Sequence, residues 1–126
     1  MSQERRPVVA IVDDDPRLLE SVEDLLESAG YAARSFSSAE SLLISGLAEL
    51  DLLITDIGMP GLDGFELRNL VRRVRSELPV FLVTGRHEVA DQGRAQGIRG
   101  FFRKPFDANV LLGTIGEALC DRENGG

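Results

Sequence analysis

Three aspartates are the residues of this chain whose types and positions could do chemistry. Asp13 and Asp14 directly follow one short apolar run, and Asp56 ends another. Carboxylates within reach of one another repel, and they raise one another's pKa unless positive charge compensates them. Lys104 could neutralise only one of the three, and a divalent cation is the natural compensation because Mg²⁺ selects carboxylate oxygens. The pattern therefore predicts a magnesium site, provided that the fold brings these aspartates together.

The same aspartates also have structural interpretations. Asp14 and Asp15 could cap the helix that begins at Pro16, and Asp56 could be a turn former. We favour capping for Asp15. For Asp13 and Asp56, each placed directly after an apolar run, we favour a functional role.

Apolar runs alternate with segments of helical periodicity, and this alternation predicts the elements that would position the aspartates. Strands are expected at residues 8–12, 31–36, 51–56, 79–84 and 100–103. Helices are expected from Pro16 to Gly30, from a capping box at Ser37–Glu40 through Leu47, from Leu67 to Val74, and from Val110 to Leu119. Five strand–helix units indicate an α/β domain with helices on both faces of a parallel sheet.

Two segments of this pattern carry further expectations. The helix around residues 67–74 presents a basic cluster, which we interpret as a solvated outer face: Arg68, Arg72, Arg73 and Arg75. The stretch at 86–97 is poorly periodic and holds Gly93, which weakens a helix. We therefore expect irregular or mobile backbone there.

Ligands of an open α/β sheet bind beyond the carboxyl ends of its strands. This rule places the three aspartates at one edge of the sheet. It adds the residues at the ends of the last two strands, which are Thr84, Gly85, Arg103, Lys104 and Pro105.

Composition and length exclude several classes of protein. The net charge of −7 argues against direct binding to nucleic acid or to an anionic membrane, since both need basic surface. A single cysteine, Cys120, allows no intramolecular disulfide, and together with a single histidine, His87, it cannot supply the usual ligands of zinc. No apolar run approaches the ~18 residues that cross a membrane, and the start lacks the apolar stretch of a signal peptide, so we expect a cytoplasmic location.

The length of 126 residues indicates one domain. We place it at residues 7–120, between an N-terminal tail at 1–6 and a C-terminal tail at 121–126. The C-terminal tail is polar and should be frayed, or form the start of a linker.

In order along the chain, four segments resemble the receiver domain of response regulators in bacterial two-component signalling. They are VVAIVDDDP at 8–16, LLITDIGMPGLDGFEL at 52–67, VFLVTG at 80–85 and FFRKPF at 101–106. The segment SFSSAESLL and the contexts of TG and KPF look most like the FixJ-type subfamily. The resemblance covers about residues 7–120. It implies a flavodoxin-like (βα)5 three-layer sandwich whose parallel sheet has the strand order 2-1-3-4-5.

The resemblance implies a role for each aspartate. Asp56 would accept a phosphoryl group. Mg²⁺ would be held by Asp13, Asp14, Asp56 and the backbone carbonyl of Gly58.

The other matching positions would support the phosphoryl group. Thr84 would donate its hydroxyl to a phosphoryl oxygen, and Lys104 would pair first with the acceptor and then with the phosphoryl group. Pro105 would follow a cis peptide bond that aims Lys104 into the site, while Gly85 leaves the mouth of the site uncrowded. Phe101 matches the position of an aromatic switch, which would turn inward as Thr84 moves.

The implied partners follow from this chemistry. The donor would be a histidine kinase or a phosphotransfer protein, and the output would be a downstream protein or a missing effector domain, with a phosphorylation-dependent homodimer as a further possibility. The domain would not be an enzyme apart from self-catalysed phosphotransfer to Asp56 and autodephosphorylation. Gly58 and Arg86 lie where they could tune the lifetime of the phosphoryl group. The chain could be a natural single-domain regulator or a fragment.

Two other functions fit parts of the sequence. A receiver fold can serve as an interaction module that is never phosphorylated, although its site usually lacks one or more of the residues present here. A phosphatase of the haloacid dehalogenase type would use Asp13 as its nucleophile and Asp15 two residues later. Arg17 and the absence of an acidic pair after the fourth strand argue against it.

Overall fold

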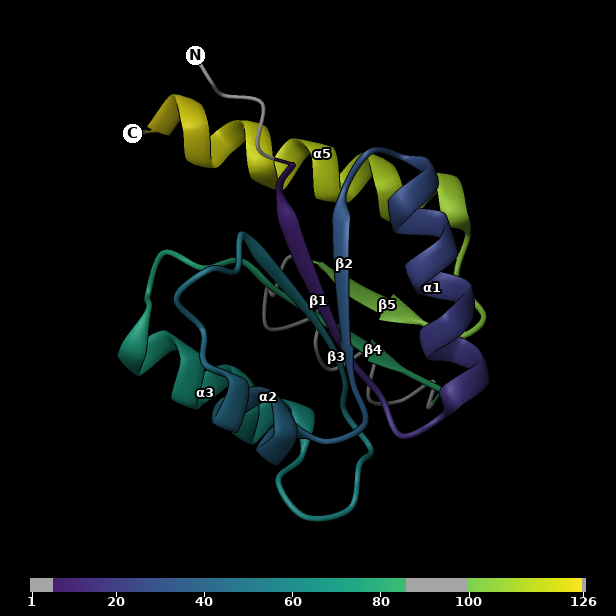
Figure 1. Ribbon diagram of the computed structural model, residues 1–126, viewed down its shortest axis with the longest axis vertical. Helices are drawn as coiled ribbons and strands as arrows, with labels where there is room; N and C mark the ends of the chain where they lie inside the picture. The colour runs from purple at the N-terminus through teal and green to yellow at the C-terminus, as the bar shows by residue number, and fades with distance from the viewer. Residues whose placement is uncertain (1–5, 86–99, 126) are drawn as a thin grey trace.

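The computed structural model describes residues 6–85 and 100–125, the last five by their backbone alone. Five parallel strands form one sheet in the order β2-β1-β3-β4-β5, as the resemblance implied (Figure 1). The strands are β1 (Val8–Val12), β2 (Ala32–Phe36), β3 (Leu52–Asp56), β4 (Val80–Thr84) and β5 (Phe101–Arg103). The helices are α1 (Pro16–Ser28), α2 (Ala39–Ser45), α3 (Gly64–Val74) and α5 (Ala108–Gly125). The expectation of irregular backbone at 86–97 lies outside the described residues.

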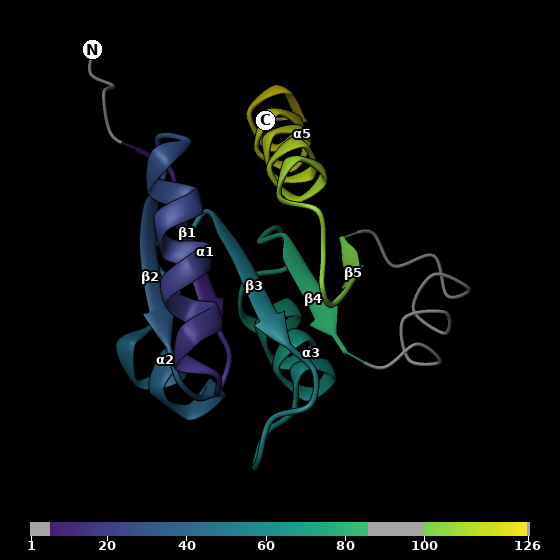
Figure 2. The ribbon, with the colours of Figure 1, turned by 90° about the vertical axis from the view of Figure 1, so that its right-hand side faces the viewer.

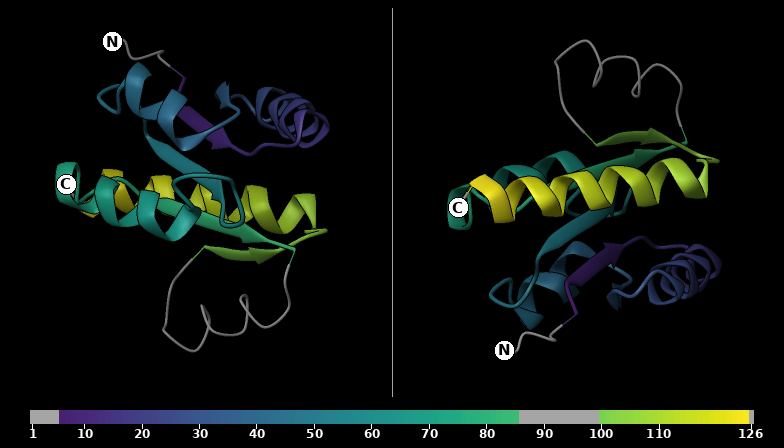
Figure 3. Two further views of the ribbon diagram at one scale, coloured as in Figure 1. Left: turned by 90° about the horizontal axis from the view of Figure 1, so that it is seen from below. Right: turned by 90° about the horizontal axis from the view of Figure 1, so that it is seen from above.

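The central strands are apolar on both sides because helices cover both faces of the sheet. One face packs against α1 and α5 through a buried cluster that includes Ile11, Ile54, Leu26 and Ile115. The opposite face packs against α2 and α3 through Val12, Leu53, Leu42 and Leu67. Figure 2 shows α1 in front of the sheet, α5 nearly end-on above it and α3 behind it, and Figure 3 shows the strands fanning out from β1 to β5.

The first helix begins and ends where the sequence indicates. Asp15 is its N-cap, and its side chain accepts a hydrogen bond from the backbone N–H of Arg17, while Pro16 occupies the first turn. Gly30 follows the last turn with a φ of +94°, a conformation that favours glycine.

The second helix starts differently from our expectation. We predicted a capping box between Ser37 and Glu40, but Ser38 is the N-cap and accepts from the backbone N–H of Ser41. This shift by one residue leaves Glu40 in the first turn of α2 but outside a capping box. A capping box does form at α3, where Asp63 and Glu66 satisfy each other's backbone N–H groups.

The closing helix is longer than predicted. We expected the polar segment after Leu119 to fray, whereas the helical backbone of α5 continues to Gly125. Within residues 6–85 and 100–125, no helix is both long enough and apolar enough to cross a bilayer.

One member of the predicted basic cluster is not a solvated side chain. The guanidinium of Arg75 donates to the backbone carbonyls of Leu47 and Leu50 at 2.7 Å each, and to the Glu77 carboxylate at 2.8 Å. Arg75 thereby fixes the connection between α2 and β3, because one guanidinium group binds two of its backbone carbonyls. This correction leaves Arg72 and Arg73 as the exposed members of the cluster.

Gly100, just before β5, is required by close packing. Its φ is +71°, and a Cβ at this position would overlap the ring of Phe81. Gly113, by contrast, lies within α5 with no atom near the place that a Cβ would occupy. The two glycines therefore offer a matched pair for testing the fold.

We predict that Gly100→Ala lowers the free energy of unfolding by about 1–3 kcal/mol, because the new methyl group is strained and overpacked. Gly113→Ala should raise it by up to about 1 kcal/mol, because alanine is the better helix former. Urea unfolding of both variants measures the two changes. Equal effects of the two substitutions would contradict the packing around Phe81.

Candidate functional site

The three sequence-predicted aspartates meet at the carboxyl ends of β1 and β3. Asp13 and Asp14 follow β1, Asp56 is the last residue of β3, and the two strands are hydrogen-bonded neighbours. One carboxylate oxygen from each of the three residues lies within 4.8 Å of the others. Asp13 and Asp56 are buried, with 1% and 8% of their surfaces exposed, whereas Asp14 is exposed. The cluster is therefore open to solvent on the side of Asp14.

Lys104 bridges the two buried carboxylates. Its Nζ lies 2.9 Å from Oδ2 of Asp13 and 3.3 Å from Oδ1 of Asp56. We expected it to neutralise one aspartate, but a single ammonium group is shared between two. The charge of the lysine is divided, so the three carboxylates keep an excess of negative charge.

The electrostatics of the site follow from this sharing. Burial raises the pKa of Asp56 above its ordinary value, and the negative charge of Asp13 raises it further, while Lys104 lowers it only in part. For Lys104, burial lowers the pKa, but the hydrogen bond to Asp13 and the charges of both aspartates outweigh burial and raise it. The lysine stays protonated, and Asp56 ionises less readily than an ordinary aspartate until more positive charge arrives.

The second oxygen of Asp13 is also engaged. Its Oδ1 accepts a hydrogen bond of 2.8 Å from the backbone N–H of Asp15, while Oδ2 takes the lysine. The carboxylate of Asp13 is thus fixed on both sides. Asp14 is the exposed member of the cluster.

Gly64, the first residue of α3, lets the helix approach the end of β3. A Cβ there would lie 2.5 Å from the backbone oxygen of Asp56 and 2.7 Å from Cα of Ile57. The backbone N–H of Gly64 also donates to the carbonyl of Ile57 at 3.0 Å. Gly64 was not among the residues that the sequence predicted for the site, and the signal that could have found it was the capping box directly around it.

The structure places the remaining site candidates at the same edge of the sheet. Thr84 ends β4 with 3% of its surface exposed, and its backbone carbonyl accepts from the N–H of Lys104 at 2.7 Å. The peptide bond between Lys104 and Pro105 is cis, which confirms the prediction. A Cβ on Gly85 would meet no atom within 4 Å, and the same holds for Gly58.

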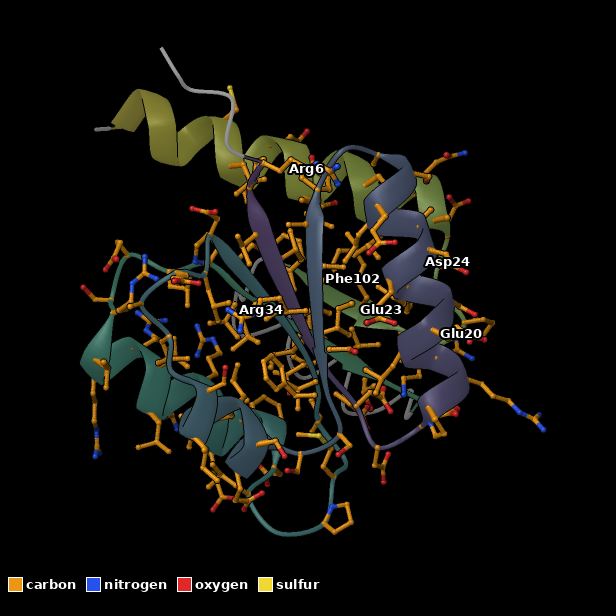
Figure 4. The ribbon with its side chains drawn as sticks, viewed as in Figure 1. Arg6, Glu20, Glu23, Asp24, Arg34 and Phe102 are labelled. Carbon is orange, nitrogen blue, oxygen red and sulfur yellow. The ribbon has the colours of Figure 1, made fainter. Side chains whose placement is uncertain are left out.

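Phe101, which matches the position of an aromatic switch, is the first residue of β5. Its ring is already buried, against Ile57 and Leu82, with its centroid 6.1 Å from that of Phe65. Phe102 points to the opposite face of the sheet, toward α1 and α5, because side chains alternate along a strand (Figure 4).

The donor set fits a hard divalent cation. Three carboxylates outweigh one shared ammonium group, two of the carboxylates are largely buried, and the third is exposed for exchange with solvent. Mg²⁺ prefers oxygen ligands and keeps several waters, so it suits a site with an exposed side. Asp13, Asp14 and Asp56 are the side chains that could hold it.

The sequence comparisons agree with one family. Residues 9–116 match the family described as the response regulator receiver domain. The chain is 32% identical over 119 residues to the transcriptional regulatory protein FixJ of Bradyrhizobium diazoefficiens, covering 91% of this chain and 58% of that protein. It is 33% identical over 114 residues to the C4-dicarboxylate transport regulator DctD of Pseudomonas aeruginosa, covering 88% of this chain and 25% of that protein. The chain thus spans about half or less of the length of these relatives.

Solved structures agree on the fold. A receiver domain protein from Methanospirillum hungatei, described as CheY-like, superposes with a TM-score of 0.81 at 29% identity, covering 96% of this chain and 99% of that one. A receiver domain protein from Clostridium thermocellum reaches a TM-score of 0.84 at 23% identity, covering 95% and 99% of the two chains.

The raised pKa of Asp56 leads to a prediction about stability. A carboxyl group whose pKa is raised by folding holds its proton more tightly in the folded state, so its ionisation costs stability as the pH rises above about 4. Asp56→Asn should therefore raise the free energy of unfolding of the metal-free protein by roughly 1 kcal/mol near pH 8. The gain should shrink as the pH falls, because Asp56 itself then takes up a proton.

Urea unfolding in the presence of EDTA, repeated at several pH values, measures this gain. Asp24→Asn on α1 (Figure 4) is the matched control, since it removes the same charge from an exposed place. A loss of stability in Asp56→Asn at neutral pH, or a gain that does not change with pH, would contradict the electrostatics described above.

Proposed function

The chain belongs to the response regulator receiver domain family, and we propose that it accepts a phosphoryl group on Asp56 with the help of Mg²⁺. The observation that carries this proposal is the arrangement of Asp56 beside Asp13, Asp14 and Lys104. Phosphoryl transfer asks mainly for positioning and for neutralisation of the phosphoryl oxygens, and this cluster can supply both. The donor in the proposal is the phosphohistidine of a histidine kinase or of a phosphotransfer protein.

Asp56 is the nucleophile in this proposal. One of its carboxylate oxygens attacks phosphorus, the bond between phosphorus and the donor's imidazole nitrogen breaks, and the nitrogen keeps the electron pair and then takes a proton from solvent. No general base is needed, because an ionised carboxylate has no proton to lose. Lys104, 3.3 Å from the acceptor oxygen, favours the ionised form of Asp56 before the reaction.

The residues around Asp56 would hold the phosphoryl group. Bound Mg²⁺, held by Asp13, Asp14, Asp56 and the carbonyl of Gly58, would neutralise phosphoryl oxygens. Lys104 would follow the negative charge onto the new group, and the Thr84 hydroxyl would donate to one of its oxygens. The open space at Gly58 and Gly85 supports access for a donor imidazole.

The output of the proposed switch is a change in packing near β5. The ring contact between Phe101 and Phe65 joins β5 to the first turn of α3, which begins directly after the acceptor loop. A new dianion at Asp56 would bias this contact through Thr84 and Lys104. The signal would pass to a downstream protein, to a second copy of the chain, or to an output domain such as a longer protein could carry, in the cytoplasm.

Acetyl phosphate provides a direct test of the acceptor. In the presence of Mg²⁺, we predict one acid-stable, base-labile phosphoryl group per chain, mapped to Asp56 by mass spectrometry, and no label in Asp56→Asn. Slow hydrolysis should follow without any added enzyme. Label on Asp13 with repeated turnover would instead support the phosphatase. An Asp56→Asn variant with unchanged partner binding and output would support an interaction module that is never phosphorylated.

Adjacent aspartates provide a test of the metal ligands. Asp14→Asn should weaken Mg²⁺ binding by about tenfold or more, since it removes a carboxylate from the cluster. Asp15→Asn changes the charge equally but lies outside the cluster, and asparagine can still cap α1. Isothermal titration calorimetry measures both affinities. Equal weakening in the two variants would mean that Asp14 acts through its charge alone.

A further inference from the structure

The loop between β3 and α3 is fixed at both ends but lightly held in the middle. At its start, the backbone N–H of Ile57 donates to the carbonyl of Val83 at 2.9 Å, and Met59 is buried. At its end, the capping box of Asp63 closes the first turn of α3. Gly58 lies between Ile57 and Met59, and Gly61 lies between Met59 and Asp63; glycine gives the backbone its greatest freedom at both positions.

Glu40 reaches this middle part from α2. Its Oε2 accepts a hydrogen bond of 3.3 Å from the backbone N–H of Leu62. Among the residues that the structure describes, this is the hydrogen bond that joins the stretch 58–62 to another element. The carboxylate is free to make it because Ser38, and not Ser37 with Glu40, caps α2.

Gly61 makes the approach of Glu40 possible. Its φ is +76°, and a Cβ there would lie 3.1 Å from Oε2 of Glu40. The neighbouring side chain of Leu62 packs against the buried cluster beneath α2 and α3. The hydrogen bond and this packing both hold the end of the loop at Leu62.

We propose that Glu40 is a positioning residue for the acceptor loop, which it holds so that the backbone carbonyl of Gly58 is presented to the metal ion. This inference rests on the proposed function, because Gly58 matters only if Mg²⁺ binds beside Asp56. Glu40 does not contact the metal or the acceptor. Residues 59–61 separate Leu62, which Glu40 binds, from Gly58, so Glu40 acts through the backbone of these three residues. In this way α2 would influence the proposed phosphorylation site.

Two substitutions at position 40 separate the hydrogen bond from the charge. Glu40→Ala removes both, whereas Glu40→Gln removes the charge at the start of α2 but keeps an oxygen that can accept from Leu62. Glu20→Ala on α1 (Figure 4) is the control for loss of one exposed negative charge. All variants are compared with the wild-type chain.

Two measurements test the role of Glu40. In the metal-free protein, the Leu62 amide should exchange with solvent several-fold faster in Glu40→Ala than in wild type or Glu40→Gln. By calorimetry, the Kd for Mg²⁺ should rise about three- to fivefold in Glu40→Ala, below the 10- to 100-fold loss typical of groups that contact a metal ligand directly. Glu40→Gln and Glu20→Ala should stay within about twofold of wild type, the range expected when no hydrogen bond is lost.

Failure of the positioning role and failure of the proposed function give different results. If wild type binds Mg²⁺ and Glu40→Ala binds it equally well, or if Glu40→Gln is weakened as much as Glu40→Ala, the positioning role is wrong. If wild type binds no Mg²⁺, the proposed function fails. Leu62 exchange then shows separately whether Glu40 holds the loop.

Discussion

A single lysine shared between two buried aspartates is the interaction on which the site depends. Lys104 lies within 3.3 Å of Asp56 and 2.9 Å of Asp13, yet Asp14 adds a third carboxylate beside them. The ammonium group offsets part of the repulsion within the cluster, but the pKa of Asp56 stays raised. Part of the negative charge is therefore uncompensated in a place that water reaches mainly from one side. The net charge of the chain, −7, says little about function, whereas this local excess says what kind of ligand the site can hold.

At two glycines, the backbone packs closely against neighbouring residues and so supports this arrangement. Gly64 lets α3 begin directly against the backbone of Asp56. Gly100 lets the chain pack against the ring of Phe81 just before β5, the strand that leads to Lys104. Side chains that are distant in the sequence hold the segments before and after β3. Arg75 fixes the segment before β3, and Glu40 contacts the loop after it. The segments before and after β3 are thus held by residues that take no part in the proposed chemistry.

The sequence predicted the features that depend on local pattern or on the edge rule for parallel sheets. Asp13 and Asp56 were found because each follows an apolar strand, and Asp15 and Gly30 because capping needs particular residue types. The strand order and the cis bond before Pro105 came from the family resemblance. Features that depend on a distant partner were missed or wrong. No local pattern shows that Arg75 reaches two carbonyls nearly thirty residues earlier, that Phe101 is buried against Phe65, or that Glu40 leaves its own helix end for the loop after β3.

Stability as a function of Mg²⁺ concentration is the sharpest test of the metal site, because a cation that binds only the folded cluster must stabilise it. Thermal unfolding of the wild-type chain should show a midpoint that is lowest in EDTA and rises steadily with the logarithm of Mg²⁺ concentration above the Kd. The same titration of Asp14→Asn should show a much smaller rise, and equal ionic strength supplied as KCl should not replace Mg²⁺. A wild-type midpoint that does not change with Mg²⁺, or that KCl raises equally, would contradict a cation site built on these aspartates.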